Sequence, residues 1–532
     1  MASQTQLSVV SNNISNAATP GYSREAVVLE VNSPGSKTGM NSAVGQGVMV
    51  TGITRRYDAL LQNQINLAQQ DYGRSNTLSQ YLSSIDQLFN EAQDIGLAGP
   101  LNDFFNAWQE VANNPQGLTE RNLLLQKADI LISSAQQLEQ GITDSIGHVN
   151  TNITSDTDQI NDLASRIALL NGQITQMESG SSVASAIQLR DKRDQALKEL
   201  NNLIETSSWE DPNNGAITVT VGQRNLVSAN NTNTLTATYT SSGSYDLKLD
   251  GLNITSKISK GEMGGLLTVQ ENLKTDLHDL RKLVASLTNQ VNLQHVQGYD
   301  LDGNAGTNFF DPLQLTVVKN AATTSLTATI TDNSLLTLDE YAVGFVDDGS
   351  GGFNYQITNS ATGAVKTSGA YNPAGTTVNL EGIRFVLSGA VTAEDNFTVS
   401  PLTSAIQDFE RNLTDPRHIA ASSGAATIPG NNANALAIAD IINTQVSALD
   451  SGSLADYYQT LIGQIGGQSK TASDNLTFAN NFLNQLTSKR DSISGVNMDE
   501  EAADLIRFQR SFQAAARVLD VADKLFQTLL NL

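Results

Sequence analysis

The last part of the chain carries an apolar pattern that constrains how the molecule can be used. From Leu505 onward, apolar residues are spaced alternately three and four positions apart, at Leu505, Phe508, Phe512, Ala515, Leu519, Ala522, Phe526 and Leu529. This spacing predicts an α-helix with one apolar stripe along its length. Chain ends usually fray unless something holds them, so we expect a partner to cover this stripe.

Composition excludes several classes of function. A chain of 532 residues predicts several domains. Its 31 basic and 54 acidic residues give a net charge of −23, which argues against nucleic acid and anionic membranes as partners. Cysteine is absent, which excludes disulfides, thiol catalysis and cysteine-ligated metal. Neither an apolar run of about 18 residues nor a secretory signal peptide is present, so we expect no membrane span and no cleavable signal.

A second, longer stripe predicts a long helix in the N-terminal half. It comprises Ile146, Val149, Ile153, Asp156, Ile160, Leu163, Ile167, Leu170, Ile174 and Met177. With Thr119 as the helix cap, the helix covers 119–178 and is about 90 Å long at 1.5 Å per residue. We expect the chain's own core to cover this stripe. Residues 178–182 end the helix, and a further helix is predicted over 183–204.

The remaining segments alternate between helical and extended patterns. Short stripes predict helices before Pro20 and from Tyr57 to Ala92, with β-branched residues over 24–56 between them. Period-two alternation predicts a small antiparallel module over 215–258, with strands at 217–221 and 235–239, and a second β region over 310–400, with strands at 341–346, 353–357 and 383–387. Helical spacing returns at 273–291, and apolar residues recur every seventh position from Tyr458 to Ile493.

These patterns predict an α+β multidomain fold, in which both chain ends form a long helical bundle or coiled-coil rod and antiparallel β domains are inserted. The predicted segments are 1–56 (an N-terminal segment with a truncated helix and a β-rich loop), 57–204 (helical rod), 205–260 (small β module), 261–308 (returning helical segment), 309–402 (outer β domain), 403–494 (C-terminal helical rod) and 495–532 (heptad helix for assembly).

The two chain ends are expected to lie together. The N-terminal stripe has only four positions, Leu7, Val10, Ile14 and Ala17, against eight in the C-terminal stripe. Pairing the two would leave apolar surface uncovered. Either the N-terminus is shorter than in the functional protein, or the terminal helix binds another chain. We therefore predict that both stripes form an assembly interface.

Candidate catalytic and metal sites are weak. The four histidines, His148, His278, His295 and His418, lack the spacing of a zinc site. The segment 300–304 resembles a calcium loop, but its glycine is misplaced and Asp311 stands where a glutamate is needed, so we predict a turn. No cofactor is expected. A carboxylate pair for glycoside cleavage stays open as an alternative.

Two charged runs have simple interpretations. Arg190–Asp194 is predicted to be a solvated helix face with ion pairs between residues three or four apart. Asp499–Glu501 precedes the terminal stripe, and acidic residues in the first turn of a helix interact favourably with its dipole.

The chain ends resemble a known family. Residues 10–16, followed by Pro20–Arg24, resemble the N-terminal signature of bacterial flagellar rod, hook and hook-associated axial proteins, and 494–502 with 505–510 resemble the C-terminal signature. Segments 101–105, 189–194 and 292–310 are similar to the hook-associated proteins of the first hook–filament junction. The family carries further helical residues before Val10, so this N-terminus is expected to be trimmed.

The resemblance implies a non-enzymatic subunit of a ring that joins the hook to the filament. Its implied partners are the flagellar hook protein, the second hook–filament junction protein, further copies of the chain, and a cytoplasmic export chaperone on the C-terminal helix. It also implies secretion through the flagellar type III channel to the outside of the cell. Alternatives are another axial protein (distal rod or second junction protein), a secreted peptidoglycan hydrolase, or a coiled-coil adhesin.

Overall fold

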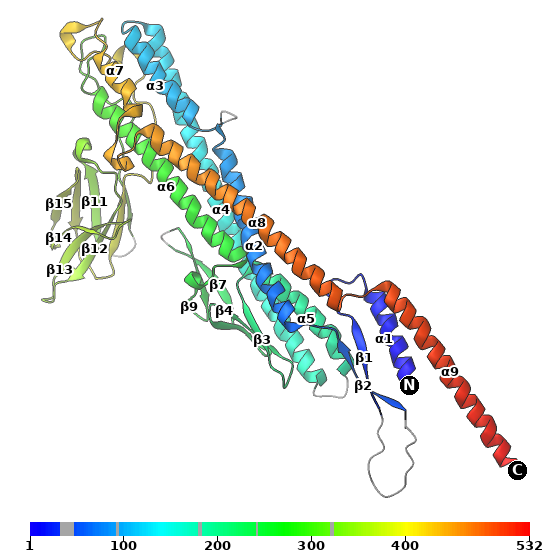
Figure 1. Cartoon of the computed structure of the whole chain (residues 1–532). Coiled ribbons are helices and arrows are strands. Elements are labelled where there is room, and N and C mark those ends of the chain that lie inside the picture. Colours follow the sequence, from blue (N-terminus) through cyan, green and yellow to red (C-terminus); the bar gives the residue numbers. More distant parts are fainter. Residues whose placement is uncertain (32–46, 92–94, 179–182, 241–242, 320–323, 532) are drawn as a thin grey trace. The chain divides into compact units, whose positions relative to one another are not determined.

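The structure is a computed structural model that describes residues 1–31, 47–91, 95–178, 183–240, 243–319 and 324–531 (Figure 1). Parts of several predictions lie outside these residues: the β-rich segment at 32–46, Ala92, the helix end at 179–182, positions 241–242 and 320–323 of the two β regions, and Leu532. The helices are α1 (Ala2–Asn16), α2 (Ala59–Leu88), α3 (Ala98–Asn113), α4 (Leu118–Glu178), α5 (Val183–Leu203), α6 (Gly261–His295), α7 (Ala433–Ala439), α8 (Leu454–Ser494) and α9 (Met498–Leu530). The predicted α+β multidomain class, with long helices and inserted antiparallel sheets, is confirmed.

The chain forms two compact units. Unit 1 comprises Met1–Ser79, Asn150–Thr268 and Ala472–Leu532, and unit 2 comprises Gln80–Val149 and Val269–Thr471. Several long helices contribute residues to both units. The division of the chain into seven segments remains a prediction.

The stripe of α4 forms much of the core of unit 1. Four of its isoleucines, spaced seven residues apart, are fully buried: Ile153, Ile160, Ile167 and Ile174. The predicted intramolecular role of this stripe is therefore confirmed. The predicted cap at Thr119 was wrong, because the helix already includes Leu118 and the Arg121 amide donates to the Gly117 carbonyl. The glycine before Leu118 therefore marks the start of α4.

Unit 1 also holds three small antiparallel sheets. One is the hairpin of β1 (Glu25–Val31) and β2 (Val48–Arg55). The others have the orders β3-β4-β5-β6 and β7-β8-β9, with bounds β3 (Ser207–Glu210), β4 (Ile217–Val221), β5 (Arg224–Ser228), β6 (Asn231–Thr232), β7 (Leu235–Tyr239), β8 (Tyr245–Leu249) and β9 (Leu252–Asn253). The two predicted strands of this module are confirmed as β4 and β7. In β4, buried residues alternate with half-buried ones, as period-two spacing requires.

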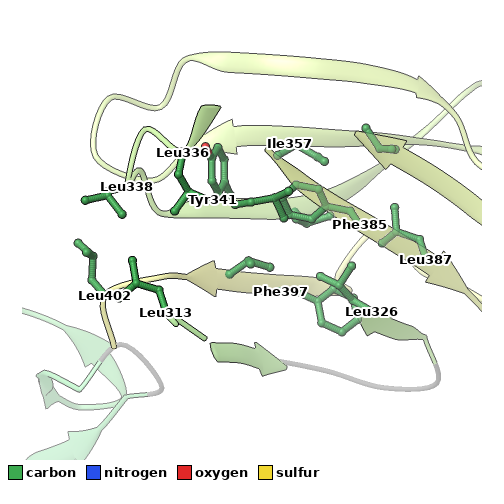
Figure 2. Packing of buried hydrophobic residues seen from close by; sticks show 14 of the residues in the cluster. Leu313, Leu326, Leu336, Leu338, Tyr341, Ile357, Phe385, Leu387, Phe397 and Leu402 are labelled. Carbon is green, nitrogen blue, oxygen red and sulfur yellow. The ribbon is translucent and has the colours of Figure 1, made fainter. Parts of the chain in front are cut away.

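A β domain in unit 2 consists of two antiparallel sheets around one core. Their orders are β10-β17-β12-β13-β14 and β11-β16-β15, with bounds β10 (Thr316–Lys319), β11 (Ser325–Ile330), β12 (Tyr341–Asp347), β13 (Phe353–Asn359), β14 (Val365–Ala370), β15 (Thr376–Leu380), β16 (Ile383–Ser388) and β17 (Asn396–Ser400). Figure 2 shows side chains from both sheets in the shared core, among them Tyr341 and Phe385, whose ring centroids lie 5.7 Å apart. The three strands predicted here are confirmed as β12, β13 and β16.

The seven-residue repeat of α8 is almost entirely buried. Tyr458, Ile465, Ala472, Ala479 and Leu486 are each less than 10% exposed, whereas Ile493, one residue from the helix end, is 37% exposed. In unit 1 this helix packs through Leu486 and Leu483 on α2, in one cluster with Leu61 and Ile65. The pattern therefore predicted both the helix and its buried face.

Candidate assembly interface

The two chain ends meet in unit 1, where α1 packs against α9 (Figure 1). Of the N-terminal stripe, Val10 is buried and Leu7 and Ile14 are half-buried. Ala17 follows the last residue of α1 and is exposed, because the chain turns there toward Gly21, whose φ is +81°. The stripe on α1 therefore has three positions rather than four.

The C-terminal stripe is covered mainly at its beginning. Leu505 and Phe508 are half-buried, and so is Ala522. From Phe512 onward the large side chains are exposed: Phe512 by 45%, Leu519 by 72%, Phe526 by 67% and Leu529 by 69%. The expected excess of the long stripe over the short one is therefore present, and most of the apolar face of α9 has no cover within the described chain.

Asn13 connects the two chain ends. It is 1% exposed and all its hydrogen-bonding capacity is used. Its Nδ2 donates to the Glu25 carbonyl (3.1 Å) and to Glu501 Oε2 (3.0 Å), and its Oδ1 accepts from the Tyr22 hydroxyl and the Glu25 amide, both at 2.9 Å. Burial raises the pKa of Tyr22, which keeps its phenol proton as a donor.

Arg24 makes a second connection to the C-terminal region. Its Nε donates to Glu501 Oε1 at 2.6 Å and its Nη1 to Glu500 Oε2 at 3.0 Å, while its backbone amide donates to the Ser494 carbonyl at 2.8 Å. Glu501 is fully buried, and such a charge must be both paired and hydrogen-bonded. We call Asn13, Tyr22, Arg24 and Glu501 the terminal latch.

Sequence reasoning placed Glu501 correctly but missed its role. The acids at 499–501 do lie in the first turn of α9, behind an Asn497 cap whose side chain accepts from the Asp499 amide. That interpretation is confirmed for the run as a whole. It gave no reason to separate buried Glu501 from exposed Glu500, because the partners of Glu501 lie almost the whole chain away. Gly495, between α8 and α9, has no room for a side chain, since a Cβ there would lie 2.3 Å from the Asp491 carbonyl oxygen.

The charged run 190–194 is not the solvated face that the sequence predicted. Arg193 is fully buried and Asp191 is 8% exposed, and their ionic partners lie outside α5. Arg55 from β2 bridges Asp191 (2.9 Å) and Asp194 (2.6 Å). Burial alone would lower the pKa of Arg55, but the two carboxylates raise it above its ordinary value. The prediction was wrong because this face of α5 contacts β2, which periodicity cannot reveal.

Arg190 and Arg193 join α5 to other parts of unit 1. Arg190 pairs with Glu178 at 2.7 Å and with Glu210. Arg193 donates to Asn171 Oδ1 at 3.1 Å, to the Gly215 carbonyl at 2.5 Å and to Glu210 at 2.8 Å, and burial lowers its pKa. These contacts connect α4, α5 and β3 rather than successive turns of one helix.

Two of the interior segments that carried the resemblance, 101–105 and 292–310, meet in unit 2, whereas 189–194 belongs to unit 1. The ring centroid of Phe104 lies 5.8 Å from that of Phe309 and 5.6 Å from that of Phe310. His295 is buried beside them. Its Nδ1 lies 2.5 Å from the Thr307 carbonyl oxygen, its Nε2 accepts from the Ala420 amide, and burial lowers its pKa to about 4. This histidine is therefore neutral and part of the core.

The segment resembling a calcium loop is a turn, as predicted. Asp300 Oδ1 accepts from the amides of Asp302 (2.9 Å) and Asn304 (2.8 Å). Asp302 pairs with Arg417, which neutralises the second carboxylate that an ion would need. Asp300, Asp302 and His418 lie near one another, but Asp300 and Asp302 already have these partners. None of the described helices has the length and apolar character needed to span a membrane.

Comparisons with known proteins decide the family. A protein-family model described as the flagellar hook-associated protein FlgK helical domain matches residues 82–310. A second family model, the D2-like domain of flagellar hook-associated protein 1, matches residues 303–401. Flagellar hook-associated protein 1 of Salmonella typhimurium is 32% identical over 100% of this chain and 98% of its own length. That of Escherichia coli is 30% identical over 100% and 97%. The chain belongs to the flagellar hook-associated protein 1 family.

The other comparisons agree with this family. Its members are structural proteins of the flagellar hook–filament junction, so the chain is a structural component of the bacterial flagellum. The solved flagellar hook junction protein FlgK of Burkholderia pseudomallei has the same fold, with a TM-score of 0.67 at 20% identity over 81% of this chain and 100% of that one. Models for the flagellar basal body rod protein and for the C-terminal region of rod FlgEFG proteins match residues 1–22 and 488–532. The terminal latch joins these two ends, although Arg24 itself lies just beyond the first match.

Proposed function

We propose that this chain is a non-enzymatic subunit of the ring that joins the flagellar hook to the filament, and that α1 and α9 provide its axial contacts. The predicted interface residues of the two stripes supply the apolar surface for these contacts. The observation that carries the proposal, beside family membership, is the exposed face of α9. An exposed apolar stripe of this length is unfavourable in water and marks a surface that binds another protein.

The terminal latch gives this interface a fixed direction. Glu501 and Asn497 lie at the start of α9, and Arg24 and Asn13 hold that start against α1. A helix that is anchored at one end and uncovered at the other is suited to insertion between neighbouring subunits. The β domain 309–402, remote in sequence from both ends, would remain free to form the outer surface.

The partners follow from this role. On either side along the axis we place the flagellar hook protein and the second hook–filament junction protein, and within the ring further copies of the chain. Before export, a cytoplasmic chaperone covers the α9 stripe, which would otherwise promote aggregation. The subunit then leaves through the flagellar type III channel and works outside the cell.

The test is electron microscopy of cells lacking this gene, with flagellin measured in the culture medium. We expect hooks without filaments and flagellin released as monomer. Complementation with the wild-type gene should restore filaments, whereas Leu519→Asp combined with Phe526→Asp should not. Gln513→Asp combined with Gln527→Asp, which puts the same two charges on α9 outside the stripe, is the matched control and should restore them. Normal filaments in the deletion strain would overturn the proposal, and loss of the hook would move the protein into the rod.

A further inference from the structure

The hairpin of β1 and β2 carries an apolar surface that the terminal stripes do not explain. Residues opposite each other in an antiparallel pair share one face of the ribbon, and alternate residues along a strand point the same way. Val27, Leu29 and Val31 alternate along β1 and so lie on one face, which they share with their partners Ile53, Val50 and Val48. The register shifts between Val28 and Leu29, and the unpaired Thr51 on β2 takes up the extra position. We call these six residues the apolar ribbon face. The opposite face is mixed, with the pairs Ala26–Thr54, Val28–Gly52 and Glu30–Met49.

This face is covered at one end only. At the base of the hairpin, Glu25 is buried and the strands contact α1 and α5. Toward the tip the side chains become exposed: Leu29 by 37%, Val48 by 54% and Val31 by 72%. A two-stranded ribbon gains little stability on its own in water, so a partner that covers the exposed part of this face would stabilise it.

The same unit contains a second uncovered apolar surface of a different shape, the distal stripe of α9 from Phe512 to Leu529. In one copy of the chain the two surfaces do not cover each other, since both are exposed. A heterologous contact joins two different surfaces, so that one surface of each copy binds the other surface of the next copy. A subunit with two different uncovered apolar surfaces can form such a contact. Such contacts close into rings or extend as helical assemblies.

Charge favours a second copy as the partner of α9. Residues 505–532 hold four Lys or Arg and two Asp or Glu, so this segment carries +2 while the rest of the chain carries −25. The cations Arg510, Arg517 and Lys524 recur every seventh residue on the side of the helix opposite the stripe. A cationic helix is attracted toward the acidic body of another copy, and its apolar stripe then supplies the contact.

We infer that the apolar ribbon face of one copy docks against the distal α9 stripe of the next copy, and that this contact links neighbouring subunits. The inference rests on the proposed ring and adds the two surfaces that meet in it. Ribbon-to-helix docking would remove Val31 and Val48, both largely exposed in the single chain, from water.

The absence of cysteine allows a direct test. Full-length Val31→Cys and Leu519→Cys proteins are mixed at raised concentration and oxidised mildly. We expect a disulfide-linked dimer in at least several-fold higher yield than for Leu519→Cys mixed with Val365→Cys, a 52% exposed valine on β14 that belongs to neither surface. A protein carrying both Val31→Cys and Leu519→Cys should give a ladder of trimers and larger species, because a heterologous contact continues from copy to copy.

Equal yields from the two mixtures would overturn the inference, and so would a predominance of Val31–Val31 dimers, which would indicate ribbon-to-ribbon pairing.

A second measurement does not depend on cysteine. Val31→Asp with Val48→Asp should reduce self-association in sedimentation several-fold at unchanged urea stability, while Val365→Asp should not. If this ribbon variant associates normally and restores filaments in deletion cells, the docking inference fails and the proposed function stands. Normal filaments in the deletion strain itself refute the proposed function instead.

Discussion

The helices α4 and α9 carry apolar stripes of the same regularity and have opposite environments. In α4, Ile153, Ile160, Ile167 and Ile174 repeat every seventh residue and are all fully buried. In α9, Phe512, Leu519 and Phe526 repeat at the same interval and are 45%, 72% and 67% exposed. Periodicity therefore specifies which side of a helix is apolar, but not whether the same chain covers it.

The two stripes differ in burial because different elements pack against the two helices. The stripe of α4 is covered by other elements of its own chain, and its Asn171 donates to the carbonyls of Ile217 and Ala229 on the small β module. The shorter α1, with only three stripe positions, packs against α9 and leaves most of the α9 stripe uncovered. Apolar spacing thus specifies a surface that has to be covered, and the fold decides which segment covers it.

The comparison can be tested with one substitution in two places. Leu170→Ala removes a leucine that is 6% exposed on α4, and Leu519→Ala removes one that is 72% exposed on α9. Burial predicts a loss of about 3 kcal/mol in the free energy of unfolding for the first and under about 0.5 kcal/mol for the second, measured by urea denaturation. Similar losses would mean that the distal stripe of α9 is covered in the free subunit.

The latch should set the local stability of the start of α9. Glu501→Gln removes the charge that Arg24 and Asn13 bind, so hydrogen exchange should show that opening of residues 498–508 becomes easier by about 2 kcal/mol. Glu500→Gln removes a carboxylate with a 61% exposed side chain on the same arginine and should cost under about 0.5 kcal/mol. Equal effects of the two substitutions would show that the latch contributes no more to local stability than an exposed ion pair does.

The latch also marks the limit of sequence reasoning. The stripes predicted most of the long helices, although α6 begins twelve residues before the first position of its stripe and α3 was missed, and alternation gave the strands β4, β7, β12, β13 and β16. Both signals are local, since they depend on neighbours within about two turns or one strand. Glu501 binds Arg24, 477 positions away, and Asp191 binds Arg55, 136 positions away. Partner identity at such distances is decided by the fold. The sequence pattern therefore could not distinguish the buried charges of Asp191 and Glu501 from exposed ones.

One residue interrupts the stripe of α4 and supplies a pH test of its burial. Asp156 is 5% exposed, and its Oδ2 has no hydrogen-bond partner among the described residues. Burial, with a smaller contribution from Glu262, raises its pKa from 3.8 to about 7. The folded state therefore holds a proton that the unfolded state releases, so this residue's contribution to stability falls as pH rises from about 4 to 7.

Replacing that carboxylate should remove the pH dependence. At pH 8, Asp156→Asn should raise the free energy of unfolding by about 2 kcal/mol, because the buried charge is gone, and at pH 4 it should change it by under about 0.5 kcal/mol. Asp158→Asn, an exposed neighbour on the same helix, is the control and should show neither effect. A pH-independent change at position 156 would mean that this aspartate is solvated in the folded protein.

The smallest expected signal concerns the terminal helix alone. An isolated helix gains little from propensity, and its stability comes mainly from a covered apolar face. A peptide of residues 495–532 should therefore show weak helical circular dichroism at micromolar concentration, and more when a peptide of residues 1–22 is added to supply the α1 surface. Full helicity of the dilute peptide would show that α9 is stable uncovered. Its exposed stripe would then be an ordinary helix surface, and the contrast with α4 would not indicate a missing partner.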